Sequence, residues 1–320
     1  MTTDDLPASV EPLPVEIKNI QPGGGVCMRI ELAWGCWRRW YLKTFRRRYV
    51  AHMLAKREGP VHEDGANACP HEVLDPRDLK FYRNQGGYYW SVENDPFRWR
   101  DQLPFARAGL VELFLLGGAM LALTVILAFA FWPLAIPTAV VGLCIVWFFR
   151  NPKRIIPSEL GAVVSPADGH IACIEEVEDE FIGEPAILIG IFLSIFDVHI
   201  NRTSMDATVV GLQYRHGKFL NALRPESARE NERMEVRLQQ NSEPRRRFVI
   251  RQIAGAIARR IVCWVGPGES LERGEQFGMI KLGSRTELVI PKEEGLEILV
   301  SLGQKVSAGS TVLAKYSQEG

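Results

Sequence analysis

The side chains in this sequence that could do covalent chemistry include a serine, a histidine and an aspartate that stand far apart along the chain. Ser284 follows Gly283 between two runs that alternate apolar and polar residues, so the pair joins or interrupts strands. His199 ends an apolar run, and Asp168 stands in a Pro-Ala-Asp-Gly stretch. Taken singly, each also fits an ordinary structural role, as a turn residue or a buried histidine.

Two other sets of residues invite a chemical interpretation. Cys69 and His71, near His62, could contribute to a metal site, but they do not complete a tetrahedral ligand set, and we expect no metal. The turn at Gln304, together with the stretch around Asp168, suggests a small barrel-like sandwich of the biotinyl and lipoyl carrier kind. A carrier needs a modifiable lysine at the tip of a turn. Lys305 stands only beside such a tip, so carrier function is disfavoured.

Length and composition exclude few classes of protein, but they indicate the size of the core. A chain of 320 residues, 47% of them hydrophobic, can bury one sizeable core with a second element beside it. The formal net charge of zero is uninformative, because basic residues cluster before residue 58, at residues 150–154 and at residues 245–260. The cysteines lack paired spacing, which favours reduced thiols in a cytoplasmic setting: Cys27, Cys36, Cys69, Cys144, Cys173 and Cys263.

Two uncharged runs predict a helical hairpin in the membrane. Residues 113–132 can form about 30 Å of helix, enough to cross a bilayer. Pro133 and Pro137 are expected to break the run, and residues 134–149 then form a shorter returning arm or a re-entrant helix. Arginines flank both ends, which places both ends in the cytoplasm. The alternative is a buried core hairpin of a soluble protein.

A basic amphipathic helix is predicted over residues 37–57. Its aromatic residues recur at steps of three and four among many arginines and lysines. Such a helix could lie on an anionic membrane surface, with its rings at the headgroup level. It could equally pack its aromatic side on the protein's own body. Nucleic-acid binding is a third and weaker option, and we expect no nucleic-acid partner.

The remaining patterns complete a three-part organisation. Residues 1–25 are expected to be loosely ordered, and residues 59–104 to form an irregular connector with one hairpin. From residue 155 short apolar runs alternate with Gly, Pro and charged turns, typical of a strand-rich domain. We therefore expect a mainly β (α+β) fold: an N-terminal extension (1–106), a membrane hairpin (107–154) and a barrel-sandwich-like catalytic domain (155–320).

Four stretches in this order resemble the phosphatidylserine decarboxylase proenzymes, specifically the short prokaryotic type with a membrane hairpin. They are FFRNPKR (148–154), SPADG (165–169), FLSIFDVHINR (192–202) and LGSR (282–285). GKFLNA (217–222) and ENER (230–233) are lesser matches. The resemblance covers about residues 107–316 and leaves residues 1–106 outside it.

The resemblance implies that the chain cuts itself between Gly283 and Ser284. The serine hydroxyl attacks the glycine carbonyl, an acyl shift gives an ester, and elimination leaves a pyruvoyl group derived from Ser284 as the covalent cofactor. Gly283 has no side chain to obstruct that attack. Ser284 needs a base. His199 can accept its proton, and Asp168 can hold the imidazole in the required tautomer.

The implied product is a heterodimer of residues 1–283 and 284–320, with further oligomerisation left open. Its pyruvoyl group would take up the serine amine of phosphatidylserine and withdraw electrons as carbon dioxide leaves, giving phosphatidylethanolamine. His199 is the candidate proton donor for that step. Asn201 and Arg202 could meet the phosphate or carboxylate of the substrate. The long-type relatives that carry a second histidine have it where this chain has Arg202.

The same resemblance implies an enzyme of the cell (inner) membrane, with the catalytic domain on the cytoplasmic side and a phospholipid as its substrate. Two alternatives stay open from the residues alone. One is a membrane-anchored lipoyl-like carrier or scaffold without catalysis. The other is the same enzyme with a different headgroup, for example threonine.

Overall fold

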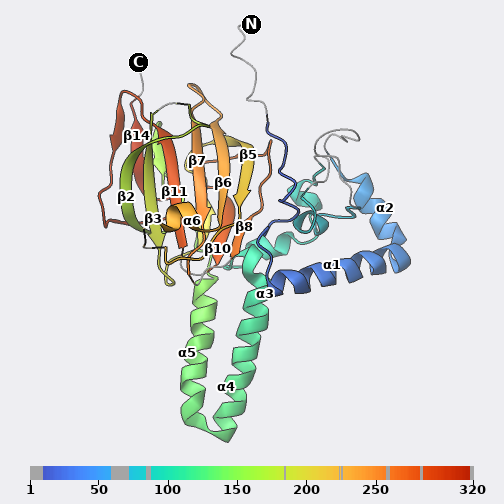
Figure 1. The fold of residues 1–320 in the computed structure, drawn as a ribbon. Helices are drawn as coiled ribbons and strands as arrows, with labels where there is room; N and C mark the ends of the chain where they lie inside the picture. The colour runs from blue at the N-terminus through green and yellow to red at the C-terminus, as the bar shows by residue number, and fades with distance from the viewer. Residues whose placement is uncertain are drawn as a thin grey trace.

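The computed structural model describes residues 10–58, 72–83, 88–183, 185–222, 224, 226–256, 260–281 and 284–317. A β-rich body carries a long helical hairpin that projects away from it, and further helices lie beside the root of the hairpin (Figure 1). The residues considered for a metal site, His62, Cys69 and His71, lie outside the described part of the chain, as do Leu282 and Gly283.

The strands in the described part of the chain form three sheets. The largest has eight strands in the order β13-β2-β3-β11-β7-β6-β5-β9, and the smaller ones have the orders β1-β14-β12 and β4-β10-β8. The bounds are β1 (Ala162–Val164), β2 (Gly169–Glu178), β3 (Pro185–Leu193), β4 (Ile200–Arg202), β5 (Ala207–Arg215), β6 (Arg233–Gln240), β7 (Arg247–Ile253), β8 (Arg260–Cys263), β9 (Ser270–Leu271), β10 (Gln276–Lys281), β11 (Ser284–Pro291), β12 (Leu296–Ile298), β13 (Lys305–Val306) and β14 (Val312–Tyr316).

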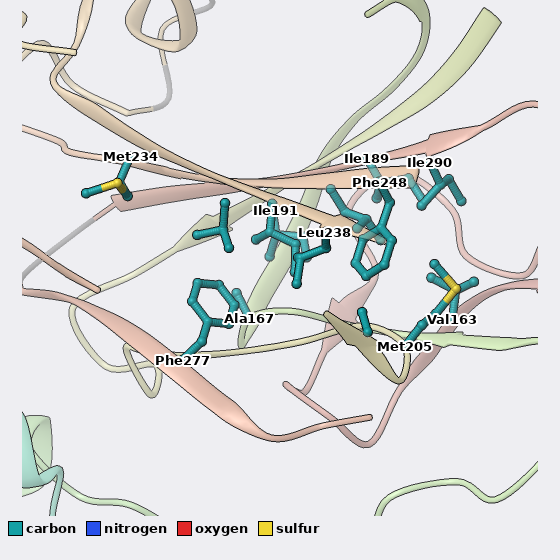
Figure 2. Close-up of a cluster of buried hydrophobic side chains, with 14 of the residues drawn as sticks. Val163, Ala167, Ile189, Ile191, Met205, Met234, Leu238, Phe248, Phe277 and Ile290 are labelled. Carbon is teal, nitrogen blue, oxygen red and sulfur yellow. The ribbon is translucent and has the colours of Figure 1, made fainter. Parts of the chain in front are cut away.

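The main core lies between the concave face of the large sheet and the two small sheets. Figure 2 shows Ile191 and Phe248 of the large sheet pointing toward Phe277 of β10 and Met205. These side chains are almost fully removed from water, and such burial contributes roughly 1.5–3 kcal/mol for each large apolar side chain. The prediction of a mainly β fold in the α+β class is confirmed.

Strand β11 is the most enclosed strand of the large sheet. It pairs with β3 on one side and with β7 on the other, and every one of its residues is buried. A strand covered on both faces lacks the alternation of a half-buried strand. Its first residue, Ser284, therefore begins in the interior of the protein.

The hairpin consists of α3 (Leu110–Glu112), a π-helical turn η6 (Leu113–Gly117), α4 (Gly118–Ala130) and α5 (Trp132–Phe148). The continuous helical stretch Arg107–Ala130 is long and apolar enough to cross a membrane. Only 6% of its most apolar 18-residue segment is buried inside the protein. Large apolar side chains such as Phe129 and Leu143 face outward along both arms. The alternative of a buried core hairpin is therefore wrong.

One local expectation about the hairpin is also wrong. The turn between the arms falls at Phe131, and Pro133 stands in the first turn of α5 as expected of a proline at a helix start. Pro137, however, lies inside α5 and does not end it. Because Pro137 lies about one turn after the start of α5, it removes only a backbone hydrogen bond to the first turn. The helix continues beyond it.

Residues 10–25 contain no helix or strand, yet they are packed on the body, which corrects the expectation of loose order. Leu13 and Ile17 belong to the main core cluster. The backbone amide of Glu11 donates to Val210, and the carbonyl of Ile20 accepts from Cys263. Residues 1–9 lie outside the described part of the chain.

The predicted helix over residues 37–57 is present in altered form. The structure has α1 (Val26–Phe45) and α2 (Arg47–Ala55), separated at Arg46, whose φ of −123° and ψ of 38° leave the helical region. One face of α1 carries a row of touching rings that includes Trp34, Trp37 and Phe45, all exposed. Beside this row, Arg38 and Arg39 hold the helix to the connector through ion pairs.

The described part of the connector, residues 72–83 and 88–104, is irregular, as predicted. These residues show no hairpin, only an isolated bridge between Glu58 and Tyr89. The elements of this part are three short 3₁₀ helices: η2 (Asp78–Lys80), η3 (Val92–Asn94) and η4 (Arg98–Gln102). A further 3₁₀ helix, η5 (Arg107–Gly109), leads into the hairpin, and one short α-helix, α6 (Ser227–Glu230), lies in the β-rich body.

The packing of the N-terminal segment makes a stability prediction. Ile17→Ala should lower the free energy of unfolding by about 2–4 kcal/mol, because the side chain is 1% exposed and its removal leaves a cavity in the core. The matched control is Val15→Ala, whose side chain is 75% exposed and whose loss should cost less than about 0.5 kcal/mol. Urea unfolding in detergent measures both. Equal effects of the two substitutions would contradict the packing described.

Candidate active site

Two neighbouring connections between sheets bring the candidate residues together. The chain leaves the small sheet at Lys281, the end of β10, and resumes in the large sheet at Ser284, the start of β11. The connection from β3 to β4 runs between the same two sheets. Ser284 is paired with Leu193 at the end of β3, and the amide of Ile280 donates to the carbonyl of His199 at 3.0 Å. Strand pairing thus places Ser284 and His199 at two neighbouring connections between the large sheet and the small sheet.

Ser284 is fully buried, and its hydroxyl oxygen has no hydrogen-bond partner in the described part of the chain. A buried polar group without a partner costs about 1–3 kcal/mol. Such groups are rare in folded proteins and call for an explanation such as a catalytic role. The sequence predicted the residue, but its enclosure follows only from the position of β11 between β3 and β7.

His199 is held as a neutral imidazole of defined tautomer. Its Nδ1 lies 2.9 Å from the backbone carbonyl of Asp197. Because a carbonyl oxygen can only accept, Nδ1 carries the proton, which leaves the lone pair on Nε2. The ring is fully buried against Phe148, with ring centroids 4.6 Å apart, and burial lowers the pKa of His199 to about 4. At neutral pH this imidazole can therefore accept a proton.

A short turn fixes the carbonyl that orients the histidine. The side chain of Asp197 accepts hydrogen bonds from the amide and hydroxyl of Ser194 at 2.9 and 2.7 Å, and its own amide donates back to the Ser194 carbonyl. Asp197 is thus a functional residue that sequence reasoning missed. The Ser-Ile-Phe-Asp spacing, which is typical of such side-chain-closed turns, was the available signal.

Asp168 is held by an arginine and a backbone amide. Its carboxylate accepts two hydrogen bonds from Nη2 of Arg154, at 2.9 and 2.7 Å, and one from the amide of Ala308 at 2.8 Å. At Nδ1 of His199, the position where we expected this carboxylate, the structure has the Asp197 carbonyl. The assignment of the imidazole tautomer to Asp168 does not match this arrangement.

Asp168 nevertheless stands at the same edge of the large sheet as the serine. It immediately precedes β2, and the strand order β2-β3-β11 aligns His170 with Phe192 and Phe192 with Arg285. Gly169 permits this close approach: it has a φ of +150°, and a Cβ there would lie 2.1 Å from the Phe192 carbonyl oxygen. Asp168 is thus held at the start of β2, and only β3 separates β2 from β11, the strand that Ser284 begins.

The two residues suggested for substrate binding have other contacts. Asn201 is fully buried; its amide donates to Thr286 at 2.9 Å, and its oxygen accepts from Gln252 at 2.9 Å. This network joins β4 to β11 and β7 and commits the side chain to the fold. Arg202 donates to the Gly274 carbonyl at 2.7 Å and lines a cavity described below.

Both ends of the hairpin contact this region. At the first arm, Glu112 forms a buried ion pair with Lys281, the last described residue before Ser284, and Gln21 accepts from the same ammonium at 3.2 Å. At the second arm, Phe148 packs on the ring of His199. The hairpin and the crossing strands therefore form one packed unit.

A buried serine hydroxyl without a described partner and a neutral, oriented imidazole at the neighbouring connection are the groups that a serine nucleophile and its base require. The family model described as Phosphatidylserine decarboxylase matches residues 141–314, more than half of the chain, and this range contains Ser284, His199 and Asp168.

Relatives agree with that match. The phosphatidylserine decarboxylase proenzyme of Rhodopirellula baltica is 55% identical over 240 residues, covering 75% of this chain and 100% of the relative. The proenzymes of Nitrosomonas eutropha and Symbiobacterium thermophilum are 41% and 43% identical, each covering 63% of this chain and 91% and 92% of the relative. The chain belongs to the phosphatidylserine decarboxylase family.

The lowered pKa of His199 predicts how self-cleavage depends on pH. The rate should be nearly constant from about pH 8 to about pH 5, because the imidazole stays neutral, and should fall about tenfold per pH unit below about pH 4. Precursor pulse-labelled in a cell-free system and chased in buffers of stepped pH would measure this. A midpoint near the ordinary imidazole pKa of about 6.5 would contradict the assigned burial and tautomer.

Proposed function

We propose that this protein cleaves itself between Gly283 and Ser284, converts Ser284 to a pyruvoyl group and then decarboxylates phosphatidylserine to phosphatidylethanolamine. Membership of the family supports the reaction. The observation that carries the assignment of residues is the buried Ser284 hydroxyl without a partner in the described chain, at a connection adjacent to that of His199.

The first stage uses groups of the chain and one water molecule. Ser284 Oγ attacks the carbonyl carbon of Gly283 while its proton passes to Nε2 of His199. The proton then moves to the Ser284 nitrogen as the peptide C–N bond breaks, which leaves an ester between the two residues. A base then removes the Ser284 Cα proton as the Cβ–O ester bond breaks, which forms a Cα=Cβ double bond and releases the Gly283 carboxylate. Hydrolysis of the resulting enamine, with loss of ammonia, completes the pyruvoyl group and separates residues 1–283 from residues 284–320 as a heterodimer.

The residues present fit such a group. It would begin β11, where pairing with β3 and β7 and burial on both faces would hold it in place. When formed, a pyruvoyl group supplies an electron sink for decarboxylation. His199 can then return a proton to the substrate carbon from which carbon dioxide leaves. Asp168 we assign a positioning role, because it joins Arg154 to Ala308 beside this edge of the sheet.

The placement at a membrane follows from the outward-facing apolar surface of the hairpin. We assign the hairpin to the cell inner membrane and the body to the cytoplasmic side, because Arg107 and Arg150 flank its two ends. The exposed side chains of Ile195 and Phe196 lie next to this root, since Arg150 donates to the Phe196 carbonyl. The active site would therefore face the headgroup layer that contains its substrate.

Helix α1 extends this membrane-facing surface. It runs across the direction of the hairpin beside the root (Figure 1). With its basic face paired to the connector, its exposed ring row is the face left for lipid, and tryptophan rings favour the headgroup level. We assign α1 to the membrane surface, in place of the predicted helix over residues 37–57.

The carrier alternative has no support in the fold. Lys305 lies in β13, paired with His170, and not at the tip of a turn where a carrier presents its modified lysine. The support for serine as the headgroup of the substrate comes from membership of the family. No side chain described above adds to it.

Self-cleavage predicts a defined pair of products. Wild-type protein on a denaturing gel should give a large fragment ending at Gly283 and a small one starting at residue 284, and Ser284→Ala should give one intact band, because the nucleophile is gone. The matched control is Ser301→Ala, an exposed serine of the same segment, which should be cleaved like wild type. Cleavage of the Ser284→Ala protein at the same bond would refute the assignment.

The membrane position of α1 predicts where its rings lie. In vesicles containing phospholipids brominated near the headgroup, Trp34→Phe together with Trp37→Phe should remove a large part of the quenched tryptophan emission. Trp90→Phe, a buried tryptophan outside α1, serves as the control and should remove little of it, because lipid cannot reach its ring. Equal losses in the two proteins would show that α1 does not lie in the headgroup layer.

A further inference from the structure

A cavity of about 690 Å³ lies where three parts of the chain meet at the root of the hairpin. The connector contributes Arg77 and Arg100, the approach to the hairpin (residues 105–109) contributes Phe105, and the catalytic body contributes Arg202 and Trp264. The family model begins at residue 141, so the two walls made by the connector and the hairpin approach are outside it.

The cavity is lined by more cations than anions. Six basic side chains face three carboxylates, and four of the six have partners: Lys80 with Glu31, Arg107 with Asp95 and Asp101, Arg83 with backbone carbonyls and Arg202 with the Gly274 carbonyl. Arg77 and Arg100 differ. Within the described part of the chain, their guanidinium groups contact only aromatic rings and form no ion pair.

The positive charge of Arg77 destabilises the charged form of Arg100. Burial, and then repulsion from Arg77 and Arg107, lowers the pKa of Arg100 to about 10. Burial also lowers the pKa of Arg77; Glu31 opposes this shift, and Arg38 and Arg107 add to it. Like charges held together in a partly desolvated cavity are stabilised by a bound anion, and guanidinium groups match the oxygens of phosphate in geometry.

The position of the cavity selects the kind of phosphate. Phe105 and Ala108 line it, and the apolar helical stretch of the hairpin begins at Arg107. The cavity therefore lies at the depth where the hairpin leaves the bilayer, which is the depth of the phospholipid phosphates. A membrane phospholipid presents its phosphate at that level without leaving the membrane.

We propose that this cavity binds the phosphate of an anionic membrane phospholipid between Arg77 and Arg100, at a site separate from Ser284. The proposal rests on the membrane placement of the hairpin given above and not on decarboxylation. A lipid bound there would contact the connector and the hairpin approach at once, and would hold the N-terminal region against the membrane-facing side of the catalytic body.

The test is a binding titration on the full chain in neutral detergent. The probe is dihexanoyl phosphatidylglycerol, which has no amine and is not a substrate, so that its binding is independent of the pyruvoyl chemistry. Arg77→Gln with Arg100→Gln should weaken its binding at least about tenfold, since each charge-assisted hydrogen bond to phosphate contributes about 1.5–3 kcal/mol. Arg77→Lys with Arg100→Lys, which keeps both charges, should bind more tightly than the glutamine pair.

The matched control is Arg29→Gln with Arg48→Gln, which removes two exposed charges from α1 and α2 and should change the dissociation constant by less than about twofold. All proteins are compared by elution volume and melting without lipid, and Arg100→Gln alone replaces the pair if the pair misfolds. Equal weakening in the control and cavity variants would overturn the site. Inorganic phosphate that binds as tightly as the lipid would overturn the lipid as its occupant.

Discussion

The buried ion pair between Lys281 and Glu112 is the contact on which this architecture depends. It ties the strand that precedes Ser284 to the first arm of the hairpin, and Phe148 ties the second arm to His199. Removal of either partner of the ion pair would leave an uncompensated charge in the interior, which typically costs 3–5 kcal/mol, so the hairpin cannot shift without disturbing the connection to Ser284. An enzyme whose substrate stays in the bilayer gains from this rigid link, because the membrane then fixes the orientation of the site.

The proposed chemistry depends on two groups that the fold keeps in states that water would not favour. Burial of β11 denies the Ser284 hydroxyl a partner among the described residues, and burial against Phe148 keeps His199 neutral. The Asp197 carbonyl completes the arrangement, because it fixes the tautomer, and although Asp197 raises the pKa of His199, burial lowers that pKa by more. A carboxylate in that position, as in a Ser-His-Asp triad, would favour the imidazolium, so this site keeps a more weakly basic and more fully neutral histidine.

Local sequence patterns predicted the parts of the structure that depend on local physics. Uncharged runs indicated the hairpin, and short apolar runs indicated the strands. The resemblance supplied Ser284 and His199. The partners of Asp168 are 14 and 140 residues away, and no pattern around Asp168 specifies them. The same holds for Ile17, whose burial depends on distant strands, and for Asn201, whose amide is used inside the fold. Residue propensities predicted neither the break at Arg46 nor the continuation of α5 through Pro137. Both depend on the surrounding structure, which overrides propensity.

The account centres on the conversion of Ser284, and mass spectrometry of the purified wild-type protein tests it most directly. We predict a C-terminal chain of residues 284–320 whose first residue is a pyruvoyl group, which blocks Edman degradation and reacts with a carbonyl reagent. A C-terminal chain that starts with an intact serine, or a chain uncut between Gly283 and Ser284 in fully folded protein, would contradict it.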